Sequence, residues 1–158
     1  MSLKTKAVFA AAFFSAALAA GIASAATYTV GTGATYRPFE YETPNKELVG
    51  FDVDLMKEIA KAGGFEVEFI NTPWDGIFAG LDSGRYDIAA NGVEVTDERA
   101  QKYDFSTPYG YIRTALIVRG DNTDIQSFED LKGKHTANSI ASTYMTLAES
   151  YGATAAGV

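Results

Sequence analysis

Residues 52–71 read DVDLMKEIAKAGGFEVEFIN, and this stretch decides the fold class. Its first part repeats apolar residues three and four positions apart, which is the spacing of one face of an α-helix. Gly63 and Gly64 then end the predicted helix, and residues 65–71 alternate apolar residues with Glu, as a strand with one buried face does. A helix that leads directly into a strand predicts an α/β protein.

The same alternation of strands and helices continues on both sides of this stretch. Further strands are predicted at residues 27–32, 87–90, 114–119, 136–138 and 153–158. Further helices are predicted at residues 74–83 and 143–151, with short helices over 96–101 and from Ser127 onward, and a hairpin is predicted over 40–47.

The first 25 residues have the parts of a cleavable secretory signal peptide. Lys4 and Lys6 give a short positive segment, residues 7–20 are uncharged and rich in Ala, Phe and Leu, and residues 23–25 read ASA. We therefore predict cleavage after Ala25. The apolar run is shorter than the roughly 20 residues that a spanning helix needs. No later stretch is longer or more apolar, so we expect no membrane insertion of the mature chain.

The composition excludes several classes of site and partner. The absence of cysteine rules out disulfides, thiolate metal sites and a lipid-modified N-terminal cysteine. The formal net charge is −7, and loss of the two signal-peptide lysines lowers it to −9, which argues against nucleic acid and anionic lipid as partners. With one histidine and no clustered metal ligands, we expect no metal, no cofactor and no catalytic residues. The signal peptide and the lack of a cysteine for a lipid anchor together predict a free protein of the periplasm. We expect it to be a monomer.

Three stretches that follow predicted strands carry candidate binding residues. Tyr36 follows the first strand, Trp74 follows the second, and residues 91–99 follow the third. In an α/β sheet the ligand crevice lies beyond the carboxyl ends of the strands, so these stretches are expected to converge. Two facing aromatic rings make a slot for a flat or cationic group. Taken alone, each aromatic residue is better explained as an ordinary core residue.

Arg99, at the end of the third stretch, is a candidate clamp for a carboxylate. Its planar guanidinium gives two parallel charge-assisted hydrogen bonds to such a group. The pattern is equally compatible with an arginine that pairs with Asp97 or Glu98 on a solvated surface.

Together these stretches resemble the family 3 extracellular solute-binding proteins, the periplasmic polar amino-acid receptors of ABC transporters. The resemblance covers essentially all of residues 28–158. The matching motifs, in chain order, are Tyr36-x-Pro38-Phe39, Gly50-Phe51-Asp52-Val53-Asp54-Leu55, Trp74-x-Gly76-Ile77, Asp87-Ile88-Ala89, Thr96-Asp97-Glu98-Arg99, Asp104-Phe105-Ser106-x-Pro108-Tyr109 and Asp130-Leu131-x-Gly133-Lys134.

The resemblance implies a two-lobed α/β fold of the type II periplasmic-binding-protein class, with the ligand held between the lobes. Residues 26–112 would form the first lobe after a signal peptide at residues 1–25, and residues 113–158 would form part of the second. The rest of the second lobe would be missing through C-terminal truncation. We therefore expect this form to bind its ligand weakly or not at all.

The resemblance also implies a role for particular residues. Arg99 would hold the α-carboxylate of the ligand, and the backbone at Gly92 would receive its α-ammonium group. Ser142 and Thr143 begin a predicted helix whose N–H groups would bind the same carboxylate, as helix N-termini bind anions. Tyr36 and Trp74 would form the aromatic walls around the ligand side chain.

Three positions depart from the family pattern. Glu94 stands where Ser or Thr is usual, and its carboxylate would either take the ligand ammonium or pair with Arg99. Gly33 replaces an acid that several relatives use to hold a polar ligand tail. Ala141 replaces a common glycine near the second-lobe helix.

The function implied is capture of a polar amino acid in the periplasm and its delivery to the permease subunits of an ABC importer, without catalysis. Two alternatives remain open. One is a periplasmic cyclohexadienyl-type dehydratase on the same scaffold, with Glu94 as the proton donor. The other is a ligand-sensing module that reports to a membrane kinase.

Overall fold

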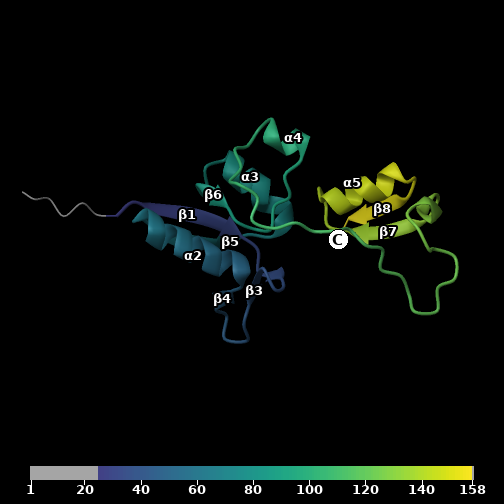
Figure 1. The fold of residues 1–158 in the computed structure, drawn as a ribbon, viewed down its shortest axis with the longest axis horizontal. Helices are drawn as coiled ribbons and strands as arrows, with labels where there is room; N and C mark the ends of the chain where they lie inside the picture. Colours follow the sequence, from purple (N-terminus) through teal and green to yellow (C-terminus); the bar gives the residue numbers. More distant parts are fainter. Residues whose placement is uncertain (1–24, 158) are drawn as a thin grey trace, which may run out of the picture.

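The computed structural model describes residues 25–157. The predicted signal peptide, apart from Ala25, lies outside these residues, as does Val158. Parallel strands alternate with helices along the described chain, so the α/β class predicted from the sequence is confirmed (Figure 1). None of the helices within residues 25–157 is long and apolar enough to cross a membrane.

The central sheet has the strand order β5-β1-β6, with β1 in the middle. The strands are β1 (Thr27–Thr32), β5 (Glu66–Asn71) and β6 (Ile88–Ala89), and both neighbours run parallel to β1. Val30, in β1, is 0% exposed and lies in the core. Because all three strands run in the same direction, the loops that follow them leave from one edge of the sheet.

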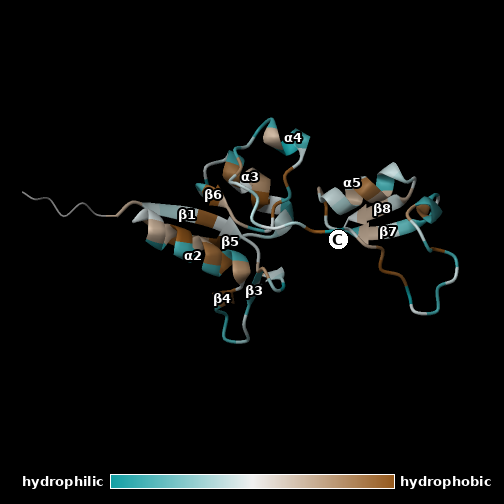
Figure 2. Ribbon diagram, in the orientation of Figure 1, coloured by the Kyte–Doolittle hydropathy of each residue, from teal (hydrophilic) through white to brown (hydrophobic). Residues whose placement is uncertain are grey.

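Helix α2 (Phe51–Gly63) confirms the helix predicted from the opening stretch. It buries Val53, Met56 and Ala60 and contacts β5 (Figure 2). Gly64 ends the helix with a φ of 70°, the left-handed conformation that glycine adopts without a steric penalty.

The helix predicted at residues 74–83 is divided into two parts. It begins as the 3-10 turn η1 (Trp74–Gly76) and continues as α3 (Ile77–Asp82), which contacts β1 and β6. Tyr86 lies beneath α3 at 1% exposure and donates its hydroxyl hydrogen to the backbone carbonyl of Ile77.

A small antiparallel sheet joins β1 to α2. It contains β2 (Thr35–Tyr36), β3 (Glu40–Glu42) and β4 (Leu48–Val49) in that order. The predicted hairpin is confirmed as β3 and β4, whereas the two-residue strand β2 was not predicted.

A second group of elements lies at the opposite end of the molecule from β1 and α2 (Figure 1). It contains the 3-10 turn η2 (Glu129–Leu131), followed by β7 (His135–Asn138), α5 (Thr143–Ser150) and β8 (Thr154–Gly157). β7 and β8 pair in parallel and α5 contacts both, which is a β-α-β unit. The strands predicted at 136–138 and 153–158 and the helix predicted at 143–151 are confirmed, whereas the short helix predicted from Ser127 onward is the three-residue 3-10 turn η2.

The strand predicted at residues 114–119 is wrong. These residues form no helix or strand, and Ile117 is 98% exposed. Their β-branched, apolar sequence suits a strand, but a strand also needs a neighbour to pair with. Within residues 25–157 no strand pairs with this segment, which stays outside the sheets although it is largely apolar (Figure 2).

The packing of Tyr86 generates a stability prediction. A methyl group on Gly31 would lie 2.3 Å from the Tyr86 ring, and one on Gly80 would lie 2.3 Å from its hydroxyl, so the ring has no room to retreat. Overpacking of this kind costs about 1–3 kcal/mol, more than the roughly 0.4–1 kcal/mol gained when a glycine is replaced in the unfolded chain. We expect Gly31→Ala to lower the free energy of unfolding in urea by about 1–2 kcal/mol.

Gly110→Ala is the matched control, because no atom lies within 4 Å of its added methyl group. It should leave the unfolding free energy unchanged or slightly raised. A Gly31→Ala variant as stable as the Gly110→Ala variant would show that the Tyr86 packing has been described incorrectly.

Candidate functional site

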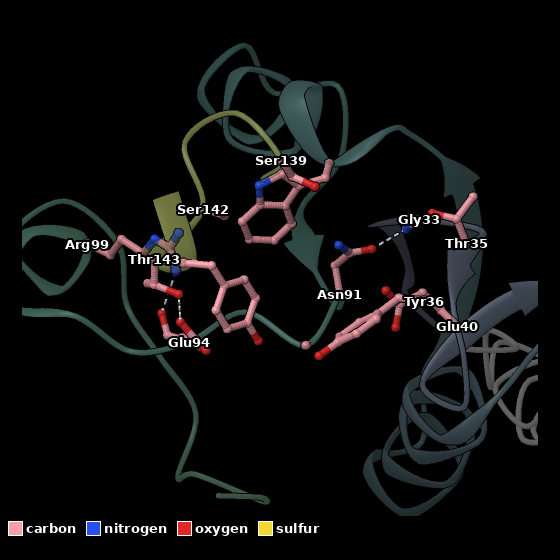
Figure 3. Close-up of a pocket in the computed structure, with 13 residues that line it drawn as sticks. Gly33, Thr35, Tyr36, Glu40, Asn91, Glu94, Arg99, Ser139, Ser142 and Thr143 are labelled. Atoms are coloured by element: carbon pink, nitrogen blue, oxygen red, sulfur yellow. Dashed lines mark hydrogen bonds between the residues drawn. The ribbon is translucent and has the colours of Figure 1, made fainter. Parts of the chain in front are cut away.

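A cavity of about 250 Å³ lies between the loops at the edge of the central sheet and the start of α5 (Figure 3). All seven residues that the sequence predicted as ligand contacts line it, although their binding role stays a prediction. The complete lining consists of Gly33, Thr35, Tyr36, Glu40, Trp74, Asn91, Gly92, Glu94, Arg99, Ser139, Ser142, Thr143 and Tyr144.

Arg99 is positioned by the short helix α4 (Asp97–Ala100). Thr96 caps this helix as predicted, with its hydroxyl oxygen accepting the N–H of Arg99 at 3.1 Å. The cap holds the first turn in place, and the Arg99 side chain extends from it to the cavity. A guanidinium group on a rigid turn is a defined anchor for an anion.

The guanidinium group of Arg99 is partly buried and has no acidic partner. It donates to the backbone carbonyl of Glu94 at 2.9 Å and to that of Ala141 at 3.2 Å. Its central carbon lies 5.5 Å from the Trp74 ring centre and 5.0 Å from that of Phe78. Among residues 25–157 no carboxylate lies within ion-pair distance of Arg99, so pairing with Asp97 or Glu98 does not occur. Burial lowers the pKa of Arg99, and the nearby charges of Glu94 and Glu98 oppose that change.

Glu94 has a different partner from either of the two considered in the sequence. Its carboxylate accepts a hydrogen bond from the Thr143 hydroxyl at the start of α5, and it forms no ion pair with Arg99 in the described chain (Figure 3). A positive and a negative side chain thus line one cavity without forming an ion pair.

The start of α5 faces the cavity, as the sequence predicted. Ser142 caps the helix by accepting the N–H of Met145 at 3.2 Å. The first N–H groups of a helix have no acceptor within it, so they are available to an anion. Ala141, just before the cap, has a φ of 58°, which costs a non-glycine residue about 1 kcal/mol or more. The alanine that the sequence showed in place of a glycine is therefore a strained position.

Three hydrogen bonds join the start of α5 to the opposite wall of the cavity. Trp74 donates its indole N–H to the carbonyl of Ile140 at 3.1 Å. The other two are the contacts of Arg99 with Ala141 and of Thr143 with Glu94. All three involve a residue predicted from the sequence to bind the ligand, so the cavity walls are held together by the site itself.

Tyr36 and Gly92 form the adjoining part of the wall. Gly92 has a φ of 55°, and a methyl group there would lie 3.1 Å from the Tyr36 ring, so glycine suits both the backbone and the close approach. The Gly92 N–H donates to the buried Asp52 carboxylate at 2.6 Å. This bond fixes the loop that carries Gly92.

Several lining residues were not predicted. Asn91 is 6% exposed, and its side-chain oxygen accepts the N–H of Gly33. Its position directly after β6 could have identified it as a site residue, because residues in the other loops at that edge of the sheet were predicted to bind the ligand. Tyr144 follows Thr143 directly, and burial raises its pKa above the usual range, as do Tyr36 and Glu94. Thr35 and Ser139 gave no signal in the sequence.

Glu40, also unpredicted, is the most unusual group in the lining. It is 0% exposed, and burial together with the nearby Asp52 charge raises its pKa to about 8. A glutamate in an alternating strand pattern is normally expected to face solvent. The burial of Glu40 was therefore not predicted from the sequence.

No group of three or more potential metal-ligating side chains is arranged around an ion site within the described residues.

Comparison with known proteins identifies the family of the chain. The family model for bacterial extracellular solute-binding proteins, family 3, matches residues 28–152. The L-cystine-binding protein TcyA of Bacillus subtilis is 45% identical over 140 residues, which cover 88% of this chain and 52% of that protein. The chain thus spans about half the length of this curated relative.

Two solved structures agree with this match. An ancestral arginine-binding protein bound to glutamine superposes with a TM-score of 0.78 at 40% identity, covering 84% of this chain and 60% of that chain. An ancestral amino acid-binding protein that is a precursor of cyclohexadienyl dehydratase superposes with a TM-score of 0.76 at 39% identity. This match covers 84% of the present chain and 60% of the ancestral protein. The described residues form part of the α/β fold of type II periplasmic binding proteins. The chain therefore belongs to the bacterial extracellular solute-binding proteins, family 3.

Proposed function

We propose that this protein captures a polar amino acid in the cavity between β1 and α5, and that it acts outside the cytoplasm. The observation that carries the proposal is the separation of charge in the cavity. Arg99 and Glu94 line the same space and are not paired with each other. An amino acid carries one carboxylate and one ammonium group close together, and it would satisfy both side chains at once.

Arg99 and the first N–H groups of α5 would bind the carboxylate of the ligand. The two side-chain hydrogen bonds of Arg99 go to neutral carbonyl oxygens, at 2.9 and 3.2 Å. Charge-assisted bonds to a carboxylate are about twice as strong as neutral ones, so a ligand would replace these contacts favourably.

Glu94 would bind the ammonium group, assisted by the backbone around Gly92. Its carboxylate is held in place by Thr143, and a carboxylate accepts several hydrogen bonds at once. Tyr36 and Trp74 would flank the side chain of the ligand. Aromatic rings at these positions suit flat, amide or cationic groups.

In the whole protein, residues 26–112 would form the first lobe and residues 113–158 would belong to the second. The hydrogen bonds from Trp74 to Ile140 and from Thr143 to Glu94 are contacts of the kind that a closed form needs. A ligand that contacts both lobes favours the closed state over the open one. The loaded protein, a monomer exported by its signal peptide to the periplasm, would deliver the amino acid to an ABC importer.

The binding function is favoured over catalysis. The related ancestral structure that precedes a cyclohexadienyl dehydratase is itself an amino acid-binding protein. Turnover of a cyclohexadienyl acid by this chain would support the enzyme instead, and signalling to a membrane kinase would support a sensory module. Because the chain spans 52% of its curated relative, we expect binding by the chain alone to be weak.

The sequence contains one tryptophan, and it lines the cavity, so its fluorescence reports ligand binding directly. We expect Arg99→Lys to raise the Kd for amino acids roughly tenfold or more, because lysine keeps the charge and loses the planar pair of donors. Arg119→Lys is the matched control. Arg119 makes a bidentate contact with Asp121 at 2.6 and 3.0 Å on an exposed loop away from the cavity. Equal affinities in the two variants would contradict the role of Arg99.

The contact between Thr143 and Glu94 generates a second prediction. Thr143→Val removes the hydroxyl while preserving the shape of the side chain, so it should destabilise the closed arrangement and raise the Kd several-fold. Thr146→Val in the same helix removes a hydroxyl that donates at 3.5 Å to the carbonyl of Ser142, the cap of the same helix. This control should bind as the unmodified chain does. Tighter binding by Thr143→Val would show that the bond competes with the ligand.

A further inference from the structure

Within residues 25–157, the guanidinium group of Arg99 lies in the cavity wall with no acidic side chain at ion-pair distance. A carboxylate beside it would orient the group strongly, and it would also compete with the carboxylate of a ligand. The two hydrogen bonds of the group go to backbone carbonyls, which the ligand is proposed to replace. Another contact must therefore keep the plane of the guanidinium group in position while these bonds are exchanged.

Two aromatic rings supply that contact. The central carbon of the Arg99 guanidinium lies 5.0 Å from the centre of the Phe78 ring and 5.5 Å from that of Trp74. Both distances are within the roughly 6 Å at which a cation is attracted to an aromatic face. The planes of the two rings are inclined by 80° and their centres are 5.8 Å apart, so the rings form a corner for the group. Trp74 lines the cavity, whereas Phe78 is not among the lining residues and contacts the arginine from outside it.

The ring of Phe78 is held in place by the elements around it. Phe78 belongs to α3, and its ring stacks on that of Tyr103 with the centres 5.3 Å apart and the planes inclined by 30°. The Tyr103 hydroxyl donates to the carboxylate of Asp82, the last residue of α3, at 2.9 Å. The backbone N–H of Tyr103 donates to the carbonyl of Arg99, also at 2.9 Å. Tyr103 thus ties α3 to the neighbouring α4, which carries Arg99 (Figure 1).

We propose that Phe78 is a positioning residue, which orients the guanidinium group of Arg99 for the carboxylate of a ligand. The inference rests on the proposed function and identifies what supports its anion-binding group. An aromatic face attracts the cation but offers no acceptor in the plane of the guanidinium group, where the N–H donors lie. The donors and the positive charge of Arg99 therefore stay available to the ligand, which a carboxylate partner would prevent.

A role in packing alone would have different consequences. Phe78 is half-buried, and α3 contacts β1 and β6 whether or not this ring faces Arg99. Leucine keeps an apolar side chain at this position and removes the aromatic face, whereas tyrosine keeps the face. If the ring serves packing alone, Phe78→Leu lowers the free energy of unfolding and leaves the affinity of the folded protein unchanged.

The Nε–H resonance of Arg99 measures the contact with the rings directly. A proton held over an aromatic ring resonates upfield, so this signal should lie upfield of its position in the urea-unfolded chain. We expect Phe78→Leu to remove part of the shift and Phe78→Tyr to keep it. Arg37, whose central carbon lies 3.8 Å from the centre of the Tyr41 ring, is the internal reference and should be unaffected by either change. An Arg99 signal at its unfolded position in the unmodified chain would overturn the proposal without any variant.

Titration with glutamine measures the effect on affinity. Amide chemical shifts are the readout, because Phe78 also contacts the fluorescent Trp74. We expect Phe78→Leu to raise the Kd about threefold to tenfold, the loss that follows removal of a partly buried cation–π contact. Phe78→Tyr should bind glutamine as the unmodified chain does. Phe128→Leu is the matched control, because Phe128 is also half-buried, forms a ring pair with Tyr151 at 5.4 Å and does not line the cavity.

The outcomes separate this inference from the proposed function. Glutamine binding by Phe78→Leu as tight as that by Phe128→Leu, or a loss that Phe78→Tyr shares, overturns the role of Phe78 and leaves amino-acid capture standing. If neither Phe78 variant folds, the Arg99 resonance of the unmodified chain decides. Absence of binding by every amino acid in a panel overturns amino-acid capture, and the role of Phe78 fails with it.

Discussion

The parallel pairing of β1 with β5 and β6 is the constraint on which the rest of the structure depends. In this register all three strands end at one edge of the sheet, and the chain leaves that edge three times. The first exit carries Gly33 and Tyr36, the second carries Trp74, and the third leads from Asn91 to Arg99. A slip of one residue in any strand would turn its buried side chains outward and move the loop that follows it.

The cavity differs from the rest of the molecule in how its charges are arranged. The four ion pairs found within residues 25–157 are partly or largely exposed and join neighbouring acids and bases, as in Lys102 with Asp82. Such exposed pairs contribute little to stability. Arg99 and Glu94 line the cavity without forming ion pairs, and solvent screens their charges less there. Charges held without ionic partners lower the stability of the folded protein. A ligand of complementary charge would offset this loss when it binds.

Much of the fold could be predicted from the sequence because the signals were local. The helix at 52–62, the strand at 27–32 and the cap at Thr96 depend on periodicity, capping and turn residues that lie within a few positions of one another. The strand predicted at 114–119 does not form, because a strand needs a neighbouring strand to pair with, and the local sequence does not show whether one is present. Residues 74–83 kept their helical character, although the first turn is a 3-10 turn.

The candidate site was predicted in outline for a related reason. Tyr36, Trp74 and the loop to Arg99 each follow a strand, and topology brings such positions together. What the sequence could not supply were contacts between distant residues, such as the hydroxyl of Thr143 on the carboxylate of Glu94. The burial of Glu40 was not predicted because an acid in a strand ordinarily points to water, and only the structure shows that its side chain is inaccessible.

The central claim is that an amino acid binds where the ends of β1, β5 and β6 face the start of α5. Mapping backbone amide chemical shifts of the ¹⁵N-labelled chain during titration with arginine tests this claim most directly, because it also detects weak binding. The account predicts that the largest shifts occur at Gly33, Gly92 and Thr143, with no change at Gly64 at the far end of α2. Shifts confined to other surfaces, or none at saturating arginine and glutamine, would contradict it.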